Sequence, residues 1–300
     1  MDTMRERFTD VTSRLLDEDP RLAVVLAVIS SDRFKDARGA HPDRIIDVGI
    51  REQLLISVAG GMALTGLRPI VHTFASFLIE RPFEQVKLDL SHQAAGAVVV
   101  SAGASYDISA GGRTHQAPGD IALLDTLDSW TMHVPGHPDE AEALIRHAAA
   151  ADNQVYVRLS EQSNRTGQPV SPGHFRVLRE GRAGVVVAVG PLLDATLEAV
   201  KGMDLCVLYA STIRPFDAAG LRAAISGTDT TDVVLIEPYL AGTSVPFANE
   251  ALQDIPHRIL PLGTSHAELR RYGTWQEHVT AHGLDAAGLR RQIRAFIKGA

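Results

Sequence analysis

The amino-acid sequence predicts an α/β protein of two domains, each built around a mostly parallel sheet. Apolar segments of strand length alternate with segments of helical periodicity, a pattern typical of parallel sheets covered by helices. A polar stretch rich in Gly, Pro, Ser and Arg divides this series in two, and a chain of 300 residues is long enough for two hydrophobic cores. We therefore expect a first domain at 1–165, a linker at 166–183 and a second domain at 184–300.

The first domain is expected to begin with a helix, because Thr3 and Glu6 have the spacing of a capping box and apolar residues follow at helical intervals. Two segments are expected to be loops: the polar one that ends at Pro42, and one at 103–114 that is rich in Gly, Ser and Ala. Strands are expected at 22–29, 45–46, 69–74, 97–101, 129–134 and 154–158, and helices after Glu52, in the latter part of 75–90, and at 119–127 and 138–150.

The second domain repeats the alternation of strands and helices. Its one cysteine, Cys206, lies in an apolar run, where a buried structural thiol is expected rather than a nucleophile. Strands are expected at 184–189, 205–210, 232–237 and 258–262, and helices at 194–201, near 246–252 and from Asp285 onward.

Charge and hydropathy narrow the classes of function. The net charge is −7 and no block of basic residues stands out, so neither nucleic acid nor an anionic membrane surface is expected as a partner. The first residues contain no apolar signal core, and no apolar run approaches membrane-spanning length. The sequence therefore predicts a soluble, cytoplasmic protein.

The stretch 44–66 is the most informative part of the chain. A short β-branched run breaks at Gly49, and the acidic residue Glu52 then enters a helical pattern. On spacing alone, Glu52 is interpreted as a surface residue that compensates the helix dipole. Gly60 and Gly61 follow inside the same helix, where each costs about 1 kcal/mol relative to alanine, so a packing reason is expected for them.

Three motifs in a fixed order connect this stretch to a known family. They are Asp47–Gln53, then Thr73–Phe77 continuing into Arg81–Gln85, then Gly112–Gln116 leading into Asp120–Leu124. With these motifs, the first domain resembles the pyrimidine-binding domain of transketolase-like thiamine diphosphate enzymes. The region from 184 onward is similar to the C-terminal domain of the family. The resemblance implies two three-layer α/β/α domains.

The resemblance covers only the C-terminal half of a full-length transketolase. In the family, a Gly-Asp-Gly motif and an Asn in a separate domain hold the cofactor's diphosphate through a divalent metal. The only Gly-Asp pair here is Gly119-Asp120, which is followed by Ile121. The resemblance therefore implies one subunit of a split transketolase, with no metal site of its own. Its expected partner is a diphosphate-binding subunit that supplies Mg²⁺ or a similar ion, in a heterotetramer of two plus two with self-association through the pyrimidine-binding domain.

The resemblance also assigns roles to residues. It places Glu52 at the catalytic glutamate that hydrogen-bonds the pyrimidine ring of thiamine diphosphate, a role that requires a carboxyl group in a largely apolar pocket. Ile50, Phe74 and Phe77 match cofactor-contacting positions, although the two phenylalanines alone would pass for ordinary core residues. His115 matches the histidine that contacts the oxygen atoms of the donor substrate. Gln116 is expected to orient that loop and to help bind substrate.

Several positions depart from the family pattern. A second histidine and an aspartate that contact the sugar are replaced by Gly103 and Gly111, and an arginine that grips the sugar phosphate is replaced by Glu161. A carboxylate at that position repels phosphate. Asp107 and Arg158 are candidate substitute contacts, with plain loop or strand-end residues as the alternative. A substrate other than the usual pentose phosphates, either a ketose or a keto acid, follows as a hypothesis.

Two alternatives to a ketol-transferring enzyme are open. One is a β-type subunit of a 2-oxo acid decarboxylase or dehydrogenase, which shares the two-domain layout. The Thr-His-Gln motif at 114–116 argues against it, because in the resembling families this motif belongs to the transketolase and deoxyxylulose-phosphate synthase branch. The other is a non-catalytic regulatory subunit. The presence of Glu52 with both phenylalanines weighs against it, because a scaffold does not need the activating glutamate.

Overall fold

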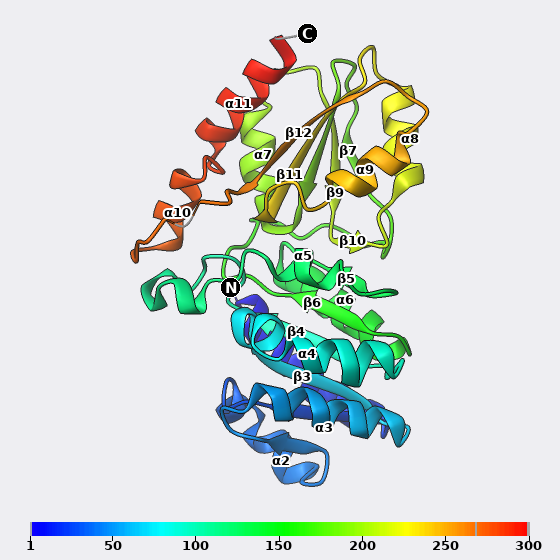
Figure 1. Ribbon diagram of the computed structural model, residues 1–300, viewed down its shortest axis with the longest axis vertical. Coiled ribbons are helices and arrows are strands. Elements are labelled where there is room, and N and C mark those ends of the chain that lie inside the picture. The colour runs from blue at the N-terminus through cyan, green and yellow to red at the C-terminus, as the bar shows by residue number, and fades with distance from the viewer. Residues whose placement is uncertain (1, 268, 299–300) are drawn as a thin grey trace.

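The computed structural model describes residues 2–267 and 269–298 and contains two α/β units stacked along the long axis of the molecule (Figure 1). The unit at the bottom of the view is called the N-terminal unit, and the one at the top, which ends in the red helix, the C-terminal unit. Each is organised around one sheet, and the expected α/β fold class is confirmed. Within the described residues, no helix is both long and apolar enough to span a bilayer.

The sheet of the N-terminal unit has seven strands among the described residues. They run in the order β10-β5-β6-β4-β3-β1-β2 and are parallel except for β10 at the edge. Strands β1, β3, β4, β5 and β6 consist mostly of buried residues, as expected for a sheet covered on both faces, whereas only Ile45 of the edge strand β2 is buried. The strands are β1 (Leu22–Leu26), β2 (Ile45–Asp47), β3 (Arg68–Phe74), β4 (Val98–Ala102), β5 (Thr131–His133), β6 (Val155–Arg158) and β10 (Thr212–Arg214).

Helices cover both faces of this sheet, which gives three layers. On one face α1 packs beside α6, with Phe8 and Ile145 in the shared core; on the other α3 packs beside η3, with Leu55 and Val86. The helical elements are α1 (Met4–Glu18), η1 (Ser31–Phe34), α2 (Lys35–Ala40), α3 (Glu52–Leu64), η2 (Ser76–Glu80), α4 (Phe83–Gln85), η3 (Val86–His92), η4 (Ser109–Gly111), η5 (Arg113–His115), α5 (Asp120–Leu124) and α6 (Pro138–Ala150).

The C-terminal unit contains a sheet of five described strands in the order β12-β11-β8-β9-β7, parallel except for β7. Its helices α7 and α11 lie side by side, and so do α8 and α9. The elements are β7 (Arg176–Arg179), β8 (Val185–Val189), η6 (Gly190–Leu192), α7 (Leu193–Ala199), β9 (Cys206–Ala210), α8 (Ala218–Ser226), β11 (Asp232–Leu240), α9 (Val245–Ala251), β12 (Arg258–Thr264), α10 (Trp275–Ala281) and α11 (Ala286–Lys298).

Three local expectations are wrong. The expected loop before Pro42 contains η1 and α2, and α2 buries no residue, so it has no apolar stripe that would reveal it. The expected single helix in 75–90 is divided into η2, α4 and η3, of which η2 and η3 are π-helical. Helices α8 and α10 were not expected, and both are short. Cys206 is buried, as expected.

Two strands cross the expected domain pattern. Strand β7 lies inside the expected linker 166–183 and pairs with β9, although Val177 in it is 56% exposed and its sequence shows no strand-like alternation. Strand β10 comes from the second half of the chain but pairs with β5 of the N-terminal unit, opposite His133 and Met132. The two units are therefore joined by a shared sheet edge, and the domain boundaries themselves stay predictions.

Candidate active site

The three sequence motifs meet at the carboxyl edge of the N-terminal sheet. Phe74 is the last residue of β3, Gly103 follows β4, and Glu52 opens α3 just after β2. Because β2, β1, β3 and β4 are parallel, these positions lie at the same edge. This edge is where open α/β sheets bind their ligands, so the strand order itself brings the motifs together.

Three of the predicted residues form an aromatic cluster at this edge. The ring centroids of Phe77 and His115 are 5.0 Å apart, those of Phe74 and His115 are 6.2 Å apart, and those of the two phenylalanines are 6.4 Å apart. All three side chains are partly exposed. The His115 ring also lies 2.9 Å from the hydroxyl of Thr114, measured from Nδ1. The cluster thus presents two phenylalanine faces and one titratable ring to the same space.

Glu52 is buried beside this cluster, with only 2% of its surface exposed. Its Oε2 atom accepts a hydrogen bond from Nη1 of Arg81 at 2.7 Å. The Arg81 guanidinium in turn lies 3.9 Å from the ring centroid of Phe77. The pocket of the carboxylate therefore differs from the largely apolar one that was expected, because a cation closes one side of it. Arg81 belongs to the second sequence motif, but its spacing there gave no reason to assign it a role.

The structure places Ile50 at the surface, 73% exposed, in the turn that precedes α3. Two more apolar residues near this turn, Val28 and Leu54, are also exposed. A carboxylate oxygen of Asp47 accepts hydrogen bonds from the backbone amides of Val28 and Gly49, which ties the end of β1 to the turn. Ile50 thus lies at the surface, two positions before Glu52.

Gly103 and Gly111 stand where the sequence departs from the family pattern, and the structure leaves no space for a larger side chain at either position. A β-carbon on Gly111 would lie 2.7 Å from the ring of His115. A β-carbon on Gly103 would overlap the side chain of Ile108, and the φ angle of +66° at Gly103 itself favours glycine. The side chains of Ile108 and His115 therefore fill the space in which the family's polar sugar contacts would lie.

Asp107 does not face the candidate site, and its interpretation as a substrate contact is corrected. It is buried, and its carboxylate accepts hydrogen bonds from the Ser160 hydroxyl at 2.9 Å, the Glu161 amide at 2.9 Å and the Gln162 side chain at 3.0 Å. Burial raises the pKa of Asp107, while these donors act in the opposite direction. Asp107 holds the segment after β6 against the 103–118 loop, so its acceptor capacity is used within the protein.

The interpretation of Arg158 as a substrate contact is also corrected, because this side chain is buried and paired within the protein. Its side chain is fully buried and forms an ion pair with Asp120, with Nε 2.7 Å from Oδ2. Nη2 donates to the hydroxyl of Ser105 at 2.7 Å, and the hydroxyl of Tyr156 donates to the same Asp120 oxygen. Among the described residues Nη1 has no partner. The pair anchors the base of the 103–118 loop beneath the site and is closed to a substrate.

Glu161, by contrast, lines a cavity of about 410 Å³ that adjoins Phe74 and Gly103. Burial and the nearby Asp107 raise the pKa of Glu161, and Arg5 acts in the opposite direction. Arg5, on α1, donates from Nε to the Ser30 hydroxyl at 2.8 Å, and its guanidinium lies 5.8 Å from the ring centroid of Phe74. No spacing in the sequence connects helix α1 to this edge, so Arg5 was missed.

Gln116 is separated from the aromatic cluster. Its side chain lines a different cavity, of about 230 Å³, together with Tyr106, Arg113, His278 of α10 and His282 just after that helix. The structure therefore brings Glu52, Phe74, Phe77 and His115 to one place, puts Glu161 at its border, and leaves Gln116 on the far side of the loop.

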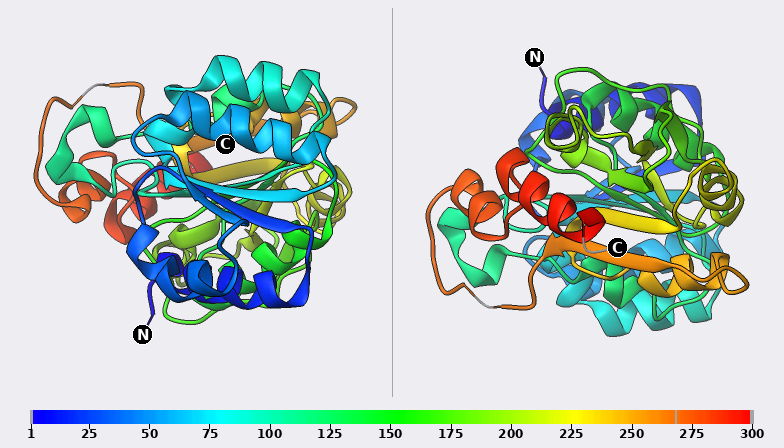
Figure 2. Two further views of the ribbon diagram at one scale, coloured as in Figure 1. Left: turned by 90° about the horizontal axis from the view of Figure 1, so that it is seen from below. Right: turned by 90° about the horizontal axis from the view of Figure 1, so that it is seen from above.

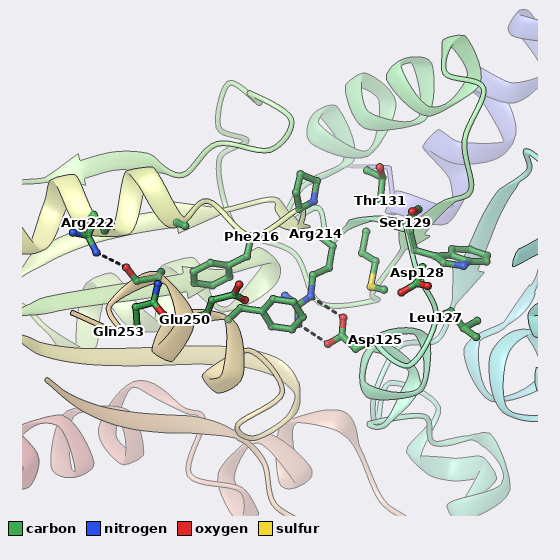
Figure 3. A pocket seen from close by; sticks show the side chains of 16 residues that line it. Asp125, Leu127, Asp128, Ser129, Thr131, Arg214, Phe216, Arg222, Glu250 and Gln253 are labelled. Atoms are coloured by element: carbon green, nitrogen blue, oxygen red, sulfur yellow. Dashed lines mark hydrogen bonds and ion pairs between the residues drawn. The ribbon is translucent and has the colours of Figure 1, made fainter. Parts of the chain in front are cut away.

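A cavity of about 900 Å³ opens between the two units (Figure 3). In it, Arg214 forms a two-point ion pair with Asp125, and its guanidinium lies 3.6 Å from the ring centroid of Phe247. Phe216 and Glu250 line the same cavity. None of the site residues expected from the sequence does, so the candidate active site lies elsewhere.

Known proteins match this chain over most of its length. Residues 2–166 match the family model described as transketolase, pyrimidine binding domain. A protein of Rhodococcoides fascians, described as an uncharacterized 33.6 kDa protein in the fasciation locus, is 50% identical and covers 97% of this chain and 93% of its own. A subunit of the apulose-4-phosphate transketolase of Actinobacillus succinogenes is 31% identical over 79% of this chain and 77% of its own.

A solved structure shares the whole architecture. It is described as a split gene transketolase, inactive beta4 tetramer, and superposes with a TM-score of 0.86 at 25% identity, covering 98% of both chains. Other matches are longer proteins. The chain spans about half the length of the curated 1-deoxy-D-xylulose-5-phosphate synthases that it matches, for example 45% of that of Thioalkalivibrio sulfidiphilus at 28% identity.

Proposed function

The chain belongs to the transketolase family, and we propose that it is the pyrimidine-binding subunit of a split thiamine diphosphate enzyme that transfers a two-carbon ketol unit. The observation that carries the proposal is the convergence of Glu52, Phe74, Phe77 and His115 at one sheet edge, from three segments distant in sequence. A buried carboxylate, an aromatic wall and a titratable ring are what binding and activating an aminopyrimidine require.

The residues present fit one end of thiamine diphosphate. The partly exposed rings of Phe74 and Phe77 offer an apolar wall for a flat heteroaromatic ring, and Glu52 offers the buried carboxyl group that would hydrogen-bond it. When bound, thiamine diphosphate supplies a nucleophilic carbon that accepts the ketol unit. Glu52 holds or releases the proton at its carboxyl oxygen, and His115 hydrogen-bonds substrate oxygen atoms. Arg81 must yield to the cofactor ring at Oε2 or share Glu52 with it.

The diphosphate end and its Mg²⁺ are assigned to a separate partner chain. The apolar residues Val28, Ile50 and Leu54 are exposed near the turn that precedes α3, and exposed apolar residues that lie together are typical of protein contacts. A family relative is named as one subunit of a transketolase, and a similar solved structure is described as an inactive beta4 tetramer of a split gene transketolase. We propose that the partner and a second copy of this chain pack around this turn, in an assembly of two plus two.

The proposed substrate is not an ordinary pentose phosphate. Glu161 brings a carboxylate to the cavity beside Phe74, and Gly103 and Gly111 leave no polar side chain where the family contacts the sugar. The family's activating residues are thus kept while its phosphate and sugar contacts are changed. Since Arg5 lies across the same cavity, a single negative charge still finds a cation there.

Reconstitution tests the proposal. The chain is mixed with a subunit that carries the Gly-Asp-Gly and Asn motif, and ketol transfer from hydroxypyruvate to an aldehyde is measured with thiamine diphosphate and Mg²⁺. In this reaction the bond between the carboxylate and the carbonyl carbon breaks and CO₂ leaves. The carbonyl carbon then bonds to the aldehyde carbon, whose oxygen takes up a proton. We expect turnover by the complex and none by either chain alone.

Calorimetry provides the control. The isolated chain is expected to bind thiamine diphosphate and Mg²⁺ only weakly, because it offers the pyrimidine end of the site alone. Micromolar binding by the isolated chain, or the lack of turnover by a properly assembled complex, would contradict the proposal.

A further inference from the structure

The C-terminal unit reaches the candidate active site through helix α10 and the segment before it. In Figure 1 α10 lies beside the teal 103–118 loop, and the two further views in Figure 2 agree. Tyr106 of the loop is buried between two rings of α10 and its end. Its centroid is 5.7 Å from that of His278, at an interplanar angle of 15°, and 5.5 Å from that of His282, at 24°. The loop that carries His115 is therefore held from both units.

A second contact covers the same loop closer to His115. Tyr272 lies against Gly112, where a β-carbon would be 2.7 Å from its Cε1 atom. The φ angle of Gly112 is +67°, so glycine suits this position both in conformation and in space. The segment from Tyr272 to His282 thus packs along the outer side of the candidate catalytic loop.

Trp275, the first residue of α10, extends this contact into the cavity that adjoins Phe74 and Glu161. It is half-buried and is the one lining residue of this cavity that comes from the C-terminal unit among the described residues. Leu159 and Ala102 add further apolar surface. The cavity beside the cofactor wall therefore has two aromatic sides, one from each unit.

The charges that line this cavity balance. Arg33 forms an ion pair with Glu6 at 3.1 Å, which leaves Arg5 facing Glu161 as the other opposite pair. A dianionic phosphate is bound where cations outnumber anions, usually with a free guanidinium in a two-point contact. Thr3 and Ser160 add two hydroxyl groups to the lining. A cavity with balanced charges and aromatic walls instead favours a group whose apolar part lies between the rings and that carries at most one negative charge.

We propose that Trp275 is a specificity-determining residue, and that the substrate group bound between Trp275 and Phe74 is apolar and carries at most one negative charge. The inference rests on the proposed function, since it names the substrate class for that site. It assigns to the C-terminal unit a direct part in substrate choice, in place of a purely structural one.

A binding experiment tests the inference without turnover. The sequence contains two tryptophans, Trp130 and Trp275, so Trp130→Phe makes Trp275 the single emitter. The full chain is used, because the three residues on which the inference rests, Phe74, Glu161 and Trp275, all belong to it. 3-Methylbutanoate is the apolar monoanionic probe and glycerol 3-phosphate the polar phosphorylated one. We expect a saturable change in emission with 3-methylbutanoate at concentrations at least ten-fold below those that glycerol 3-phosphate needs.

Kinetics on the reconstituted complex give the second measurement. With hydroxypyruvate as donor, kcat/KM is compared for 3-methylbutanal and glyceraldehyde 3-phosphate. Trp275→Ala is expected to lower the ratio of the two values at least ten-fold, Trp275→Phe to restore most of it, and Gln276→Ala, one position further on the exposed side of α10, to leave it unchanged.

Tighter binding of glycerol 3-phosphate, no emission change with either probe, or an unchanged kcat/KM ratio in Trp275→Ala would overturn the inference. A complex that turns over no aldehyde refutes the proposed function instead. The emission result with the chain alone is independent of that outcome, so the two failures are told apart.

Discussion

Glu52 combines deep burial with a single cationic partner, Arg81, whose side chain is 37% exposed. Removing the water around a carboxylate makes its interactions with neighbouring groups stronger, so a cofactor ring that displaces Arg81 would replace a strong interaction of Glu52. Arg81 also covers the face of Phe77, the ring that the cofactor would contact. Arg81 therefore contacts both groups that a pyrimidine ring would need, the carboxylate of Glu52 and the ring of Phe77.

Glu52→Gln is expected to leave folding and assembly intact but to slow hydrogen–deuterium exchange at the thiazolium C2 of bound cofactor by at least about 10²-fold, the usual contribution of a positioned acid or base. The amide keeps the shape of the side chain but does not exchange a proton with the ring. Exchange is followed by NMR after rapid quenching of the reconstituted complex. Glu84→Gln, an exposed residue on α4, serves as the matched control. An exchange rate equal to wild type in Glu52→Gln would rule out this role.

Glu161→Arg is expected to raise kcat/KM for xylulose 5-phosphate by about ten- to a hundred-fold relative to an unphosphorylated donor. A charge-assisted arginine–phosphate contact contributes roughly 1.5 to 3 kcal/mol, and the native carboxylate opposes it. Steady-state kinetics of the complex provide the measurement. Glu198→Arg, an exposed residue on α7, controls for the change in net charge. If wild type already uses the pentose phosphate with high efficiency, Glu161 does not face the substrate.

Two adjacent glycines of helix α3, Gly60 and Gly61, differ in the space around them. A β-carbon on Gly60 would lie 2.7 Å from the backbone oxygen of Asp89, so this glycine lets α3 and η3 approach closely. Gly61 is exposed and has nothing within 4 Å of such a carbon. The close approach also permits a hydrogen bond from the Ser57 hydroxyl to the Asp89 carboxylate at 2.5 Å. The expected packing reason therefore holds for one glycine of the pair.

Gly60→Ala is expected to lower the free energy of unfolding of the chain by about 1 to 3 kcal/mol, because η3 must move away. Gly61→Ala, the matched control on the same helix, is expected to raise it by up to about 1 kcal/mol, because alanine favours the helix. Urea denaturation followed by circular dichroism measures both. Equal effects of the two substitutions would show that the α3–η3 contact is not tight in solution.

Over the molecule as a whole, the junction between the units is held by buried polar groups. Arg214 of β10 pairs with Asp125 at the end of α5, and its Nη1 donates to the Ser244 hydroxyl at 3.2 Å. The Ser244 amide donates to Glu237, whose second oxygen has no partner among the described residues. Burial raises the pKa of Glu237 to about 7. The C-terminal unit thus contains a carboxyl group that favours its neutral form beside the interface.

This group predicts a pH dependence of stability. Between pH 4.5, its ordinary pKa, and about 7, the folded chain retains a proton that the unfolded chain releases, so the contribution of Glu237 to stability falls as the pH rises. The free energy of unfolding of wild type relative to Glu237→Gln is expected to decrease by about 2 to 3 kcal/mol from pH 5 to pH 8.

Urea titrations of both proteins across this range check the prediction. The difference between them cancels the opposite trend of His72 and His133, whose pKa values burial lowers to about 3 and which stabilise the chain as the pH rises towards 6.5. Glu250→Gln, an exposed residue on α9, is the control. A difference that stays constant with pH would show that Glu237 is ionised throughout.

Local patterns in the sequence were sufficient to predict most of the strands and helices. The capping box of Thr3 and Glu6 closes as expected, and the apolar runs that became β1, β4 and β8 are buried along their length. Such patterns involve residues only a few positions apart, so they can be recognised without knowledge of the tertiary structure. The motifs around Glu52, Phe74 and His115 were found for the same reason, since each is a short contiguous run. Thr274 and Glu277 form a second capping box with the same spacing, at α10, although no helix was expected there.

The contacts between distant segments were settled by folding alone. Asp107 and Arg158 looked available for a substrate, but Ser160, Gln162 and Asp120 consume their hydrogen-bonding capacity from up to 55 positions away. Arg81 reaches Glu52, α1 brings Arg5 to Phe74, and α10 brings Trp275 to the same cavity. Which buried polar group pairs with which, and which side chains share a cavity, depends on how the sheets stack and where the connections cross, and no local periodicity records that.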